Sequence, residues 1–355
     1  MDKASTELSI REIDWLFTPF LHRKLNLRTR LVMSSLPRLL ARRGVPTPEM
    51  LAYYEQRAVH QLGLIVTEPV AVNDAAAAAD EGKVCFYGGE ALRAWKSICR
   101  AVHGLGCCMA PLLSHAGMRR YPALPAIGPS GIAPDTLKHC GESMSRERIR
   151  TVVQAFAAGA DAARRLGFDA VVINGGDAGL IDQFLRPETN HRHDEYGGDI
   201  VARARFACEV VHAVRKAVGR RFPVIFRFSQ GGVGSRAGAL AHTPAELEAF
   251  LHVLCEAGVD MFACGGQGPA FSGSPLGLGG WTRLLTQRPV IVEDGVGLPG
   301  LRVEYVVRRM RAGEFDLVSV GRALLADAAW GSKIRQGSES DILPFTVRDD
   351  GNEDG

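Results

Sequence analysis

Short apolar runs rich in β-branched residues recur along the whole chain, and stretches with helical spacing separate them. This alternation predicts an α/β fold in which helical crossovers join the strands of a parallel sheet. Eight such runs favour a closed (β/α)8 or TIM barrel over an open sheet. The predicted strands are Leu31 to Met33, Leu64 to Thr67, Cys108 to Leu113, Ala170 to Ile173, Val224 to Phe228, Met261 to Ala263, Val290 to Val292 and Leu317 to Val320.

Three stretches between these runs have clear helical signals. Arg146 to Leu166 and Val201 to Val218 carry apolar residues at helical spacing, and Thr243 begins a third helix with a capping signal three positions later. A chain of 355 residues, 46% of them hydrophobic, can bury one large core. We therefore expect a single barrel domain over residues 1–355, with flexible termini at 1–15 and 345–355.

The longest connections follow the third and fourth predicted strands, at Ser114 to Ser145 and Asn174 to Ile200. Loops at the carboxyl ends of barrel strands carry functional sites, so these two are predicted to form pocket walls. The glycine-rich stretch from Gly265 to Gly280 lacks the spacing of a dinucleotide fingerprint. We interpret it as a mobile loop over the pocket.

Charge and hydropathy limit the classes of partner. The net charge of +3 is spread along the sequence, with only short basic clusters such as Arg119–Arg120, which predicts no nucleic-acid binding. No segment approaches the roughly 20 apolar residues of a membrane span, and Met1 to Phe17 contains no signal-like apolar run. No residues have the spacing of a metal cluster. We expect a cytoplasmic protein that binds neither nucleic acid nor membranes, with a homo-oligomer left open.

Motifs from near the start of the chain to near its end match one known family. They are LFTPFLHRKLNLRTRLVMSSLPR, YYEQRAVHQLGLIVTE, LLSHAGMRR, FRFS and DLVSVGRALLADAAW, at the first, second, third, fifth and eighth predicted strands. The strongest signature is the loop that carries Asn190, Arg192, Asp194, Tyr196, Gly197 and Gly198. Through these motifs, Leu16 to Trp330 resembles the old yellow enzyme family of FMN-dependent ene-reductases, or NADH:flavin oxidoreductases.

The resemblance implies an FMN-dependent oxidoreductase with NAD(P)H as its reductant, acting on a small conjugated or cyclic organic molecule. In the family, a His/Asn pair polarises the carbonyl oxygen of an enone and a Tyr protonates its α-carbon. This chain has Asn174, Asp177 and Gly179 at those positions. Asn174 can still donate a hydrogen bond, whereas an ionised Asp177 cannot and Gly179 supplies no proton. The proton chemistry is therefore predicted to differ.

Asp177 has three interpretations. It is a general base for a desaturation or a redox-neutral isomerisation, a partner for a cationic amine substrate, or a cap for a helix near Ala178. His115 is a candidate replacement acid because its unperturbed pKa of roughly 6.5 suits proton transfer, although such a histidine is more often a buried wall residue. The alternative to an enzyme is a degenerate barrel that binds a ligand or partner without catalysing a reaction.

The resemblance also suggests which residues contact FMN. Arg227 is predicted to face the pyrimidine edge of the ring, and its alternative role is a salt bridge in the barrel mouth. Gly295, Gly321 and Arg322 follow the seventh and eighth strands, where backbone amides and a guanidinium can hold a phosphate. Their alternative role is to make turns and cap a helix.

Three polar contacts of the family to the FMN ring are absent from this sequence. Pro37 stands where a Thr or Cys is usual, Leu112 replaces a Gln, and Pro69 has no backbone hydrogen to donate. These losses predict weaker binding of the ring edge, with FMN still held by its phosphate, ribityl chain and ring faces.

Overall fold

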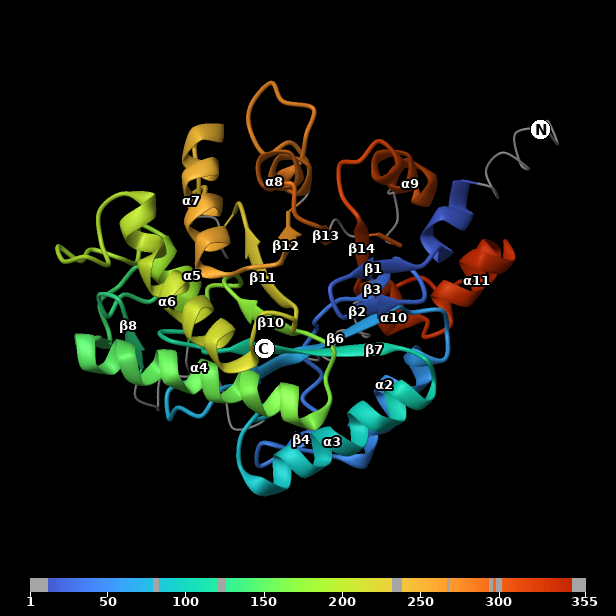
Figure 1. Ribbon diagram of the computed structural model, residues 1–355, viewed down its shortest axis with the longest axis horizontal. Helices are drawn as coiled ribbons and strands as arrows, with labels where there is room; N and C mark the ends of the chain where they lie inside the picture. Colours follow the sequence, from blue (N-terminus) through green and yellow to red (C-terminus); the bar gives the residue numbers. More distant parts are fainter. Residues whose placement is uncertain are drawn as a thin grey trace.

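All eight predicted strands are present and close into one parallel barrel (Figure 1). The computed structural model describes residues 12–78, 83–119, 126–231, 238–266, 268–293, 296–297 and 302–346. In order around the barrel, the strands are β3 (Leu31–Met33), β6 (Leu64–Ala71), β7 (Cys108–Ser114), β10 (Val171–Asn174), β11 (Val224–Ser229), β12 (Met261–Gly265), β13 (Val290–Glu293) and β14 (Leu317–Val320), which pairs with β3. The predicted (β/α)8 barrel is confirmed.

Helices surround the strands (Figure 1). The longer ones are α2 (Pro48–Ala58), α3 (Gly89–Gly104), α4 (Arg146–Leu166), α6 (Ile200–Val218), α7 (Pro244–Ala257), α8 (Leu278–Thr286), α9 (Val303–Arg311) and α11 (Trp330–Gln336). Short segments are α5 (Leu180–Leu185), α10 (Arg322–Ala326), η1 (Asp14–Phe17) and η2 (Glu339–Asp341). The Thr243 hydroxyl accepts the N–H of Glu246 at 3.2 Å, which confirms the predicted start of α7.

Three small two-stranded sheets were not predicted. They are β1 (Phe20–His22) with β2 (Leu25–Leu27), β4 (Ala41–Arg42) with β5 (Val45–Pro46), and β8 (Ile127–Gly128) with β9 (Glu142–Ser143). Phe20, Leu25 and Leu27 of the β1–β2 hairpin share a buried cluster with the side chains inside the barrel. The hairpin therefore closes the amino-terminal end of the barrel, while the carboxyl end carries the longer loops.

The interpretation of residues 265–280 as a loop over the pocket is wrong in two respects. Residues 278–280 belong to α8, and no described residue of the stretch lines the cavity at the carboxyl end of the barrel. A Cβ atom at Gly279 would lie 2.4 Å from the Val292 side chain. This glycine therefore lets α8 pack closely against β13.

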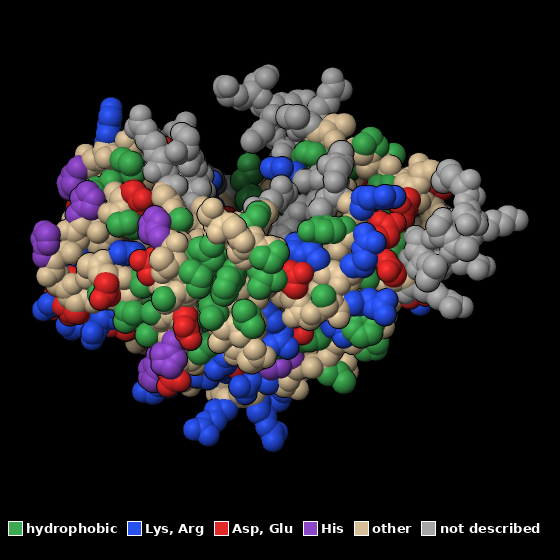
Figure 2. Space-filling view, turned by 90° about the horizontal axis from the view of Figure 1, so that it is seen from above, with side chains coloured by type: hydrophobic (Ala, Val, Ile, Leu, Met, Phe, Trp, Pro, Cys, Tyr) green, Lys and Arg blue, Asp and Glu red, His purple; other side chains and the backbone are tan. Residues whose placement is uncertain are grey.

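Acidic and basic side chains are interspersed over the face shown in Figure 2, in keeping with a net charge of +3 spread along the sequence. Among the described helices, none is long and apolar enough to cross a membrane.

Candidate active site

A cavity of about 510 Å³ lies among the loops at the carboxyl ends of the barrel strands, where barrel enzymes carry their active sites. Its described lining consists of Ser35, Leu36, Pro37, Leu39, Glu68, Pro69, Lys83, Ser114, Ala116, Arg119, Asn174, Asp177, Gly179, Arg227 and Arg322. The structure thus brings together five predicted site residues from four parts of the chain: Pro37, Asn174 with Asp177, Arg227 and Arg322.

Arg227, on β11, is held between two carboxylates. Its Nε atom lies 3.0 Å from both oxygens of Glu293, its Nη2 lies 2.8 Å from Glu293 Oε2, and its Nη1 pairs with Asp177. Burial disfavours the charged form of Arg227, but the two carboxylates outweigh burial and raise its pKa. The alternative role of Arg227 as a salt-bridge residue is therefore present in the structure, although Arg227 also lines the cavity. The three groups sum to a charge of −1.

The amide of Asn174 has a defined orientation. Its Oδ1 atom accepts hydrogen bonds from the Gly176 N–H and from Arg227 Nη1, both at 3.2 Å. The Nδ2 atom is left with one long contact, 3.5 Å to the Ser114 hydroxyl. Asn174 therefore keeps a donor that a ligand oxygen in the cavity can accept from.

Asp177 lies in a left-handed turn, with φ of 56° at Asp177 and 54° at Ala178. Non-glycine residues adopt this conformation at some energetic cost, and such residues are frequent at functional sites. The interpretation of Asp177 as a helix cap is wrong, because the carboxylate of Asp182 accepts the Ala178 N–H at 3.0 Å. The side chain of Asp177 pairs with Arg227 instead.

The loop with the strongest sequence signature shapes the structure around the site. Asn190 Nδ2 donates at 2.7 Å to the carbonyl oxygens of both Phe184 and Tyr196. Arg192 forms a two-bond pair with Asp194, at 2.9 and 2.7 Å. Neither Asn190 nor Arg192 lines the cavity. The signature therefore fixes the long connection after β10 and takes no direct part in the site.

His115 follows β7 but points away from the cavity. Its side chain is fully buried, its Nδ1 atom accepts the Gly117 N–H at 3.0 Å, and its Nε2 atom therefore donates to Asp74 at 3.1 Å. Burial lowers the pKa of His115, although Asp74 opposes this. Burial would raise the pKa of Asp74, but hydrogen bonds from His115 and Ala76 lower it to about 2. The role of His115 as an acid stays a prediction that this geometry does not support.

Of the three residues predicted to hold a phosphate, two are described. Gly321 precedes α10, and a Cβ atom there would lie 3.3 Å from the Cβ of Ser34, so little space surrounds its backbone. Arg322 lines the cavity, with its guanidinium 5.7 Å from the ring of Phe345. Gly295 lies outside the described residues.

The substitutions at the ring edge do not block the cavity. Pro37 and Pro69 line it, whereas Leu112 is fully buried inside the barrel and does not reach it. The pairing of β6 with β7 shifts between Val66 and Pro69, and the Thr67 hydroxyl accepts the Leu112 N–H at 3.1 Å. This bulge accommodates a proline that cannot donate to the ladder.

Sequence reasoning missed four polar residues of the lining: Ser35, Lys83, Ser114 and Arg119. The Ser35 hydroxyl is buried and has no hydrogen-bond partner among the described residues, as expected of an atom that awaits a ligand. Ser114 directly follows one predicted strand, and Ser35 lies two residues after the end of another. That position was the available signal for both.

Residues 15–341 match the NADH:flavin oxidoreductase / NADH oxidase family. The chain belongs to this family. FMN is the cofactor of the family and NAD(P)H its reductant, so the resemblance drawn from the motifs is confirmed. The matches do not favour the isomerase, desaturase or non-catalytic alternatives.

Two relatives illustrate the match. The chain is 31% identical over 325 residues to an NADPH dehydrogenase of Bacillus licheniformis, covering 89% of this chain and 92% of that protein. It is 30% identical over 342 residues to a metal reductase of Desulforamulus reducens, covering 93% of this chain but 50% of that protein. The chain therefore spans about half the length of some curated relatives of the family.

Solved structures share the fold. An old yellow enzyme from a Pichia species superposes with a TM-score of 0.83 at 24% identity, covering 95% of this chain and 90% of that one. A morphinone reductase superposes with a TM-score of 0.81 at 23% identity, covering 94% and 92%.

The residues of the cavity fit the family cofactor. Leu36, Pro37 and Pro69 offer apolar walls for a flat ring, and Arg322 offers a cation for a phosphate. The unpartnered Ser35 hydroxyl adds a polar contact. A volume of about 510 Å³ lies within the usual range for cofactor pockets, roughly 300 to 1,000 Å³.

Proposed function

We propose that this chain is an FMN-dependent, NAD(P)H-linked reductase of activated carbon–carbon double bonds in small conjugated or cyclic molecules, with altered proton delivery. One observation supports this most directly: Asn174 Nδ2, Arg227 and Arg322 line one cavity in a chain of this family. FMN, when bound, supplies the hydride chemistry.

Asn174 is the proposed donor to the substrate carbonyl. Its Nδ2 atom makes only the 3.5 Å contact to Ser114, so it can donate to an oxygen on which negative charge develops. Asp177 has one oxygen engaged by Arg227, which offsets the charge that would otherwise repel an enolate. Together with Arg227 and Glu293, Asp177 is proposed to set the electrostatic potential at the ring edge.

Proton delivery is the proposed point of departure from the family. Gly179, which the motif resemblance aligns with the tyrosine of the family, lines the cavity, and the described lining contains no tyrosine or histidine. Ser35 and Ser114 belong to the lining, and neither hydroxyl is a strong acid. We expect solvent to supply the proton, so reduction of a simple enone should be slow relative to reduction of the protein by NADPH.

The test is spectroscopic. The protein as isolated, or after addition of FMN, should show flavin absorbance that NADPH bleaches without oxygen and that 2-cyclohexenone restores. A colourless protein that takes up no FMN would contradict the cofactor assignment. Flavin that resists NADPH but is bleached by a saturated ketone would reverse the direction of electron flow and favour a desaturase.

A further inference from the structure

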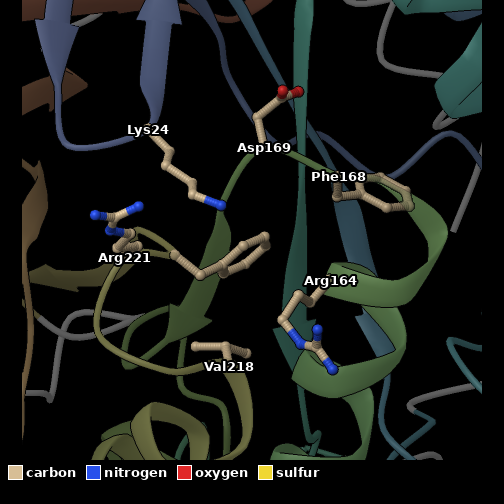
Figure 3. A pocket seen from close by; sticks show the side chains of 7 residues that line it. Lys24, Arg164, Phe168, Asp169, Val218 and Arg221 are labelled. Atoms are coloured by element: carbon tan, nitrogen blue, oxygen red, sulfur yellow. The ribbon is translucent and has the colours of Figure 1, made fainter.

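A second cleft, of about 440 Å³, is lined by residues from the turn between β1 and β2 and from the segments before β10 and β11, and so lies at the opposite end of the barrel. Figure 3 shows its lining side chains from close by. Its walls are the turn between β1 and β2, the end of α4 with the segment before β10, and the end of α6 with the loop before β11. The lining residues are Lys24, Arg164, Phe168, Asp169, Val218, Arg221 and Phe222. The proposed reductase activity gives this cleft no role.

The cleft has an apolar floor and a basic rim. Phe168, Val218 and Phe222 are buried, whereas Lys24 and Arg221 are exposed. A cleft of this composition suits a ligand that is apolar at one end and anionic at the other.

The one acidic residue of the lining does not neutralise the rim. Asp169 Oδ2 lies 2.8 Å from His103 Nε2 and accepts the Met109 N–H at the same distance. Its carboxylate points away from the ammonium of Lys24 in Figure 3. The charge of Asp169 is therefore balanced on the far side of the cleft wall.

Two cations of the rim have no counter-ion in the described part of the chain. Lys24 and Arg221 make no ion pair or side-chain hydrogen bond there, whereas Arg164 pairs with Asp161 at 2.8 Å. Basic residues often sit at helix carboxyl ends because they offset the helix dipole, and Arg164 in the last turn of α4 fits that role. This role does not apply to the other two cations. Lys24 lies in a hairpin turn, and Arg221 lies beyond the α6 cap at Gly219.

The walls are held in place before any ligand arrives. Arg215 Nη1 donates to the carbonyl oxygens of Gly219 and Phe222, both at 2.7 Å, and so fixes the loop after α6. Arg23 donates to the Arg220 carbonyl at 2.8 Å and pairs with Asp260, which ties the hairpin to that loop. A preformed cleft requires less ordering on binding.

We propose that this cleft binds a small organic anion in which a phosphate or carboxylate is attached to a flat apolar ring. The ring contacts the floor formed by Phe168, Val218 and Phe222, and the anion pairs with Lys24 and Arg221. The site is independent of the candidate active site, at the other end of the barrel.

The experiment is a calorimetric titration of the full chain with phenyl phosphate, benzoate and inorganic phosphate. Phenyl phosphate should bind at one site about tenfold more tightly than inorganic phosphate, because only the former covers the apolar floor. The double variant Lys24→Ser/Arg221→Ser should weaken that binding by about tenfold or more, through loss of two charge contacts. Benzoate shows whether a carboxylate suffices: binding within threefold of phenyl phosphate supports a carboxylate ligand, and weaker binding supports a phosphate.

Two controls keep the result specific. Lys96→Ser/Arg100→Ser removes the same charge from exposed positions on α3 and should leave the affinity unchanged. Arg322→Ser should also leave it unchanged, because that residue belongs to the other cavity. The proposal is overturned if the double variant, with an unchanged melting temperature, binds as the parent does. Inorganic phosphate binding as tightly as phenyl phosphate, or loss of binding in Arg322→Ser, would overturn it equally.

Discussion

The two clefts at the two ends of the barrel differ in whether their cations are paired with carboxylates. At the carboxyl end, the Arg227 side chain is 14% exposed and is held by Glu293 and Asp177. At the amino end, Lys24 and Arg221 are exposed and have no acidic partner in the described chain. A buried charge without a partner is costly, whereas water solvates an exposed one.

This difference assigns the two sets of cations different tasks. The charge of Arg227 is already compensated, so it acts on a ligand through the potential of the whole cluster. Lys24 and Arg221 can each form a new ion pair, since no existing one has to be broken.

The largest expected effect is that of Arg227→Leu, which leaves Glu293 and Asp177 without their cation. Breaking a buried pair from one side costs about 3 to 5 kcal/mol, so the free energy of unfolding in urea should fall by that amount. The matched change Arg221→Leu removes an exposed arginine and should alter it by less than about 0.5 kcal/mol. Equal decreases in the free energy of unfolding of the two variants would show that the cations of the two clefts do not differ in their pairing.

The next effect concerns the reactive cluster. The triple variant Asn174→His, Asp177→Asn, Gly179→Tyr should raise enone turnover by about 10²-fold or more, because a positioned acid contributes roughly 10² to 10⁴. Gly179 has an ordinary φ of −67°, and a Cβ atom there would lie 3.2 Å from the His115 carbonyl oxygen, so a side chain is tight but admissible.

The control for the triple variant is Asn174→His/Asp177→Asn with Gly179 retained. It lacks the acid and should gain much less in stopped-flow reoxidation by 2-cyclohexenone. A folded, FMN-loaded triple variant with no gain would mean that these three positions do not correspond to the reactive positions of the family.

A smaller effect is expected for Glu293→Gln, which changes the charge of the Arg227 cluster from −1 to 0. Bound reduced flavin carries more negative charge than oxidised flavin, so the variant should favour reduced FMN by about tenfold, or roughly 30 mV in midpoint potential. Spectroelectrochemical titration measures this shift. Glu314→Gln, which removes the partner of Arg309 outside the site, should leave the potential unchanged, and an unshifted potential in Glu293→Gln would exclude the cluster as an influence on FMN.

The sequence predicted the strands of the barrel because each is a continuous apolar run between polar turns. The β1–β2 hairpin was not predicted because strands of three residues are too short to show a periodic pattern of apolar residues. Asn174 and Arg227 were predicted as site residues through the motif resemblance. The barrel brings them together because parallel strands end at the same rim. The pairing of Glu293 with Arg227 depends on which side chains point inward from β11 and β13, which the sequence pattern does not specify. The cleft at the amino end of the barrel forms only when a hairpin and two loops are brought together, so no local motif marks it.

The smallest expected effect concerns the ion pair between Asp169 and His103, beside the cleft at the amino end of the barrel. A hydrogen bond with Asp169, aided by Cys99, raises the pKa of His103 from 6.5 to about 10. Because the folded protein holds this proton more tightly than the unfolded chain, the stabilisation is complete below about pH 6.5 and is lost as the pH rises through about 10.

The two side chains are 36% and 25% exposed, so solvent screening limits the effect to below about 1 kcal/mol. The difference in unfolding free energy between the parent and His103→Gln should shrink from pH 7 to pH 10.5, with other high-pH effects cancelling in the subtraction. A difference that stays constant would show that Asp169 is not balanced by an imidazolium. The net charge around the cleft would then be lower by one, because the carboxylate of Asp169 would be uncompensated. The Arg227 cluster, whose arginine pKa is raised, should not change over this range.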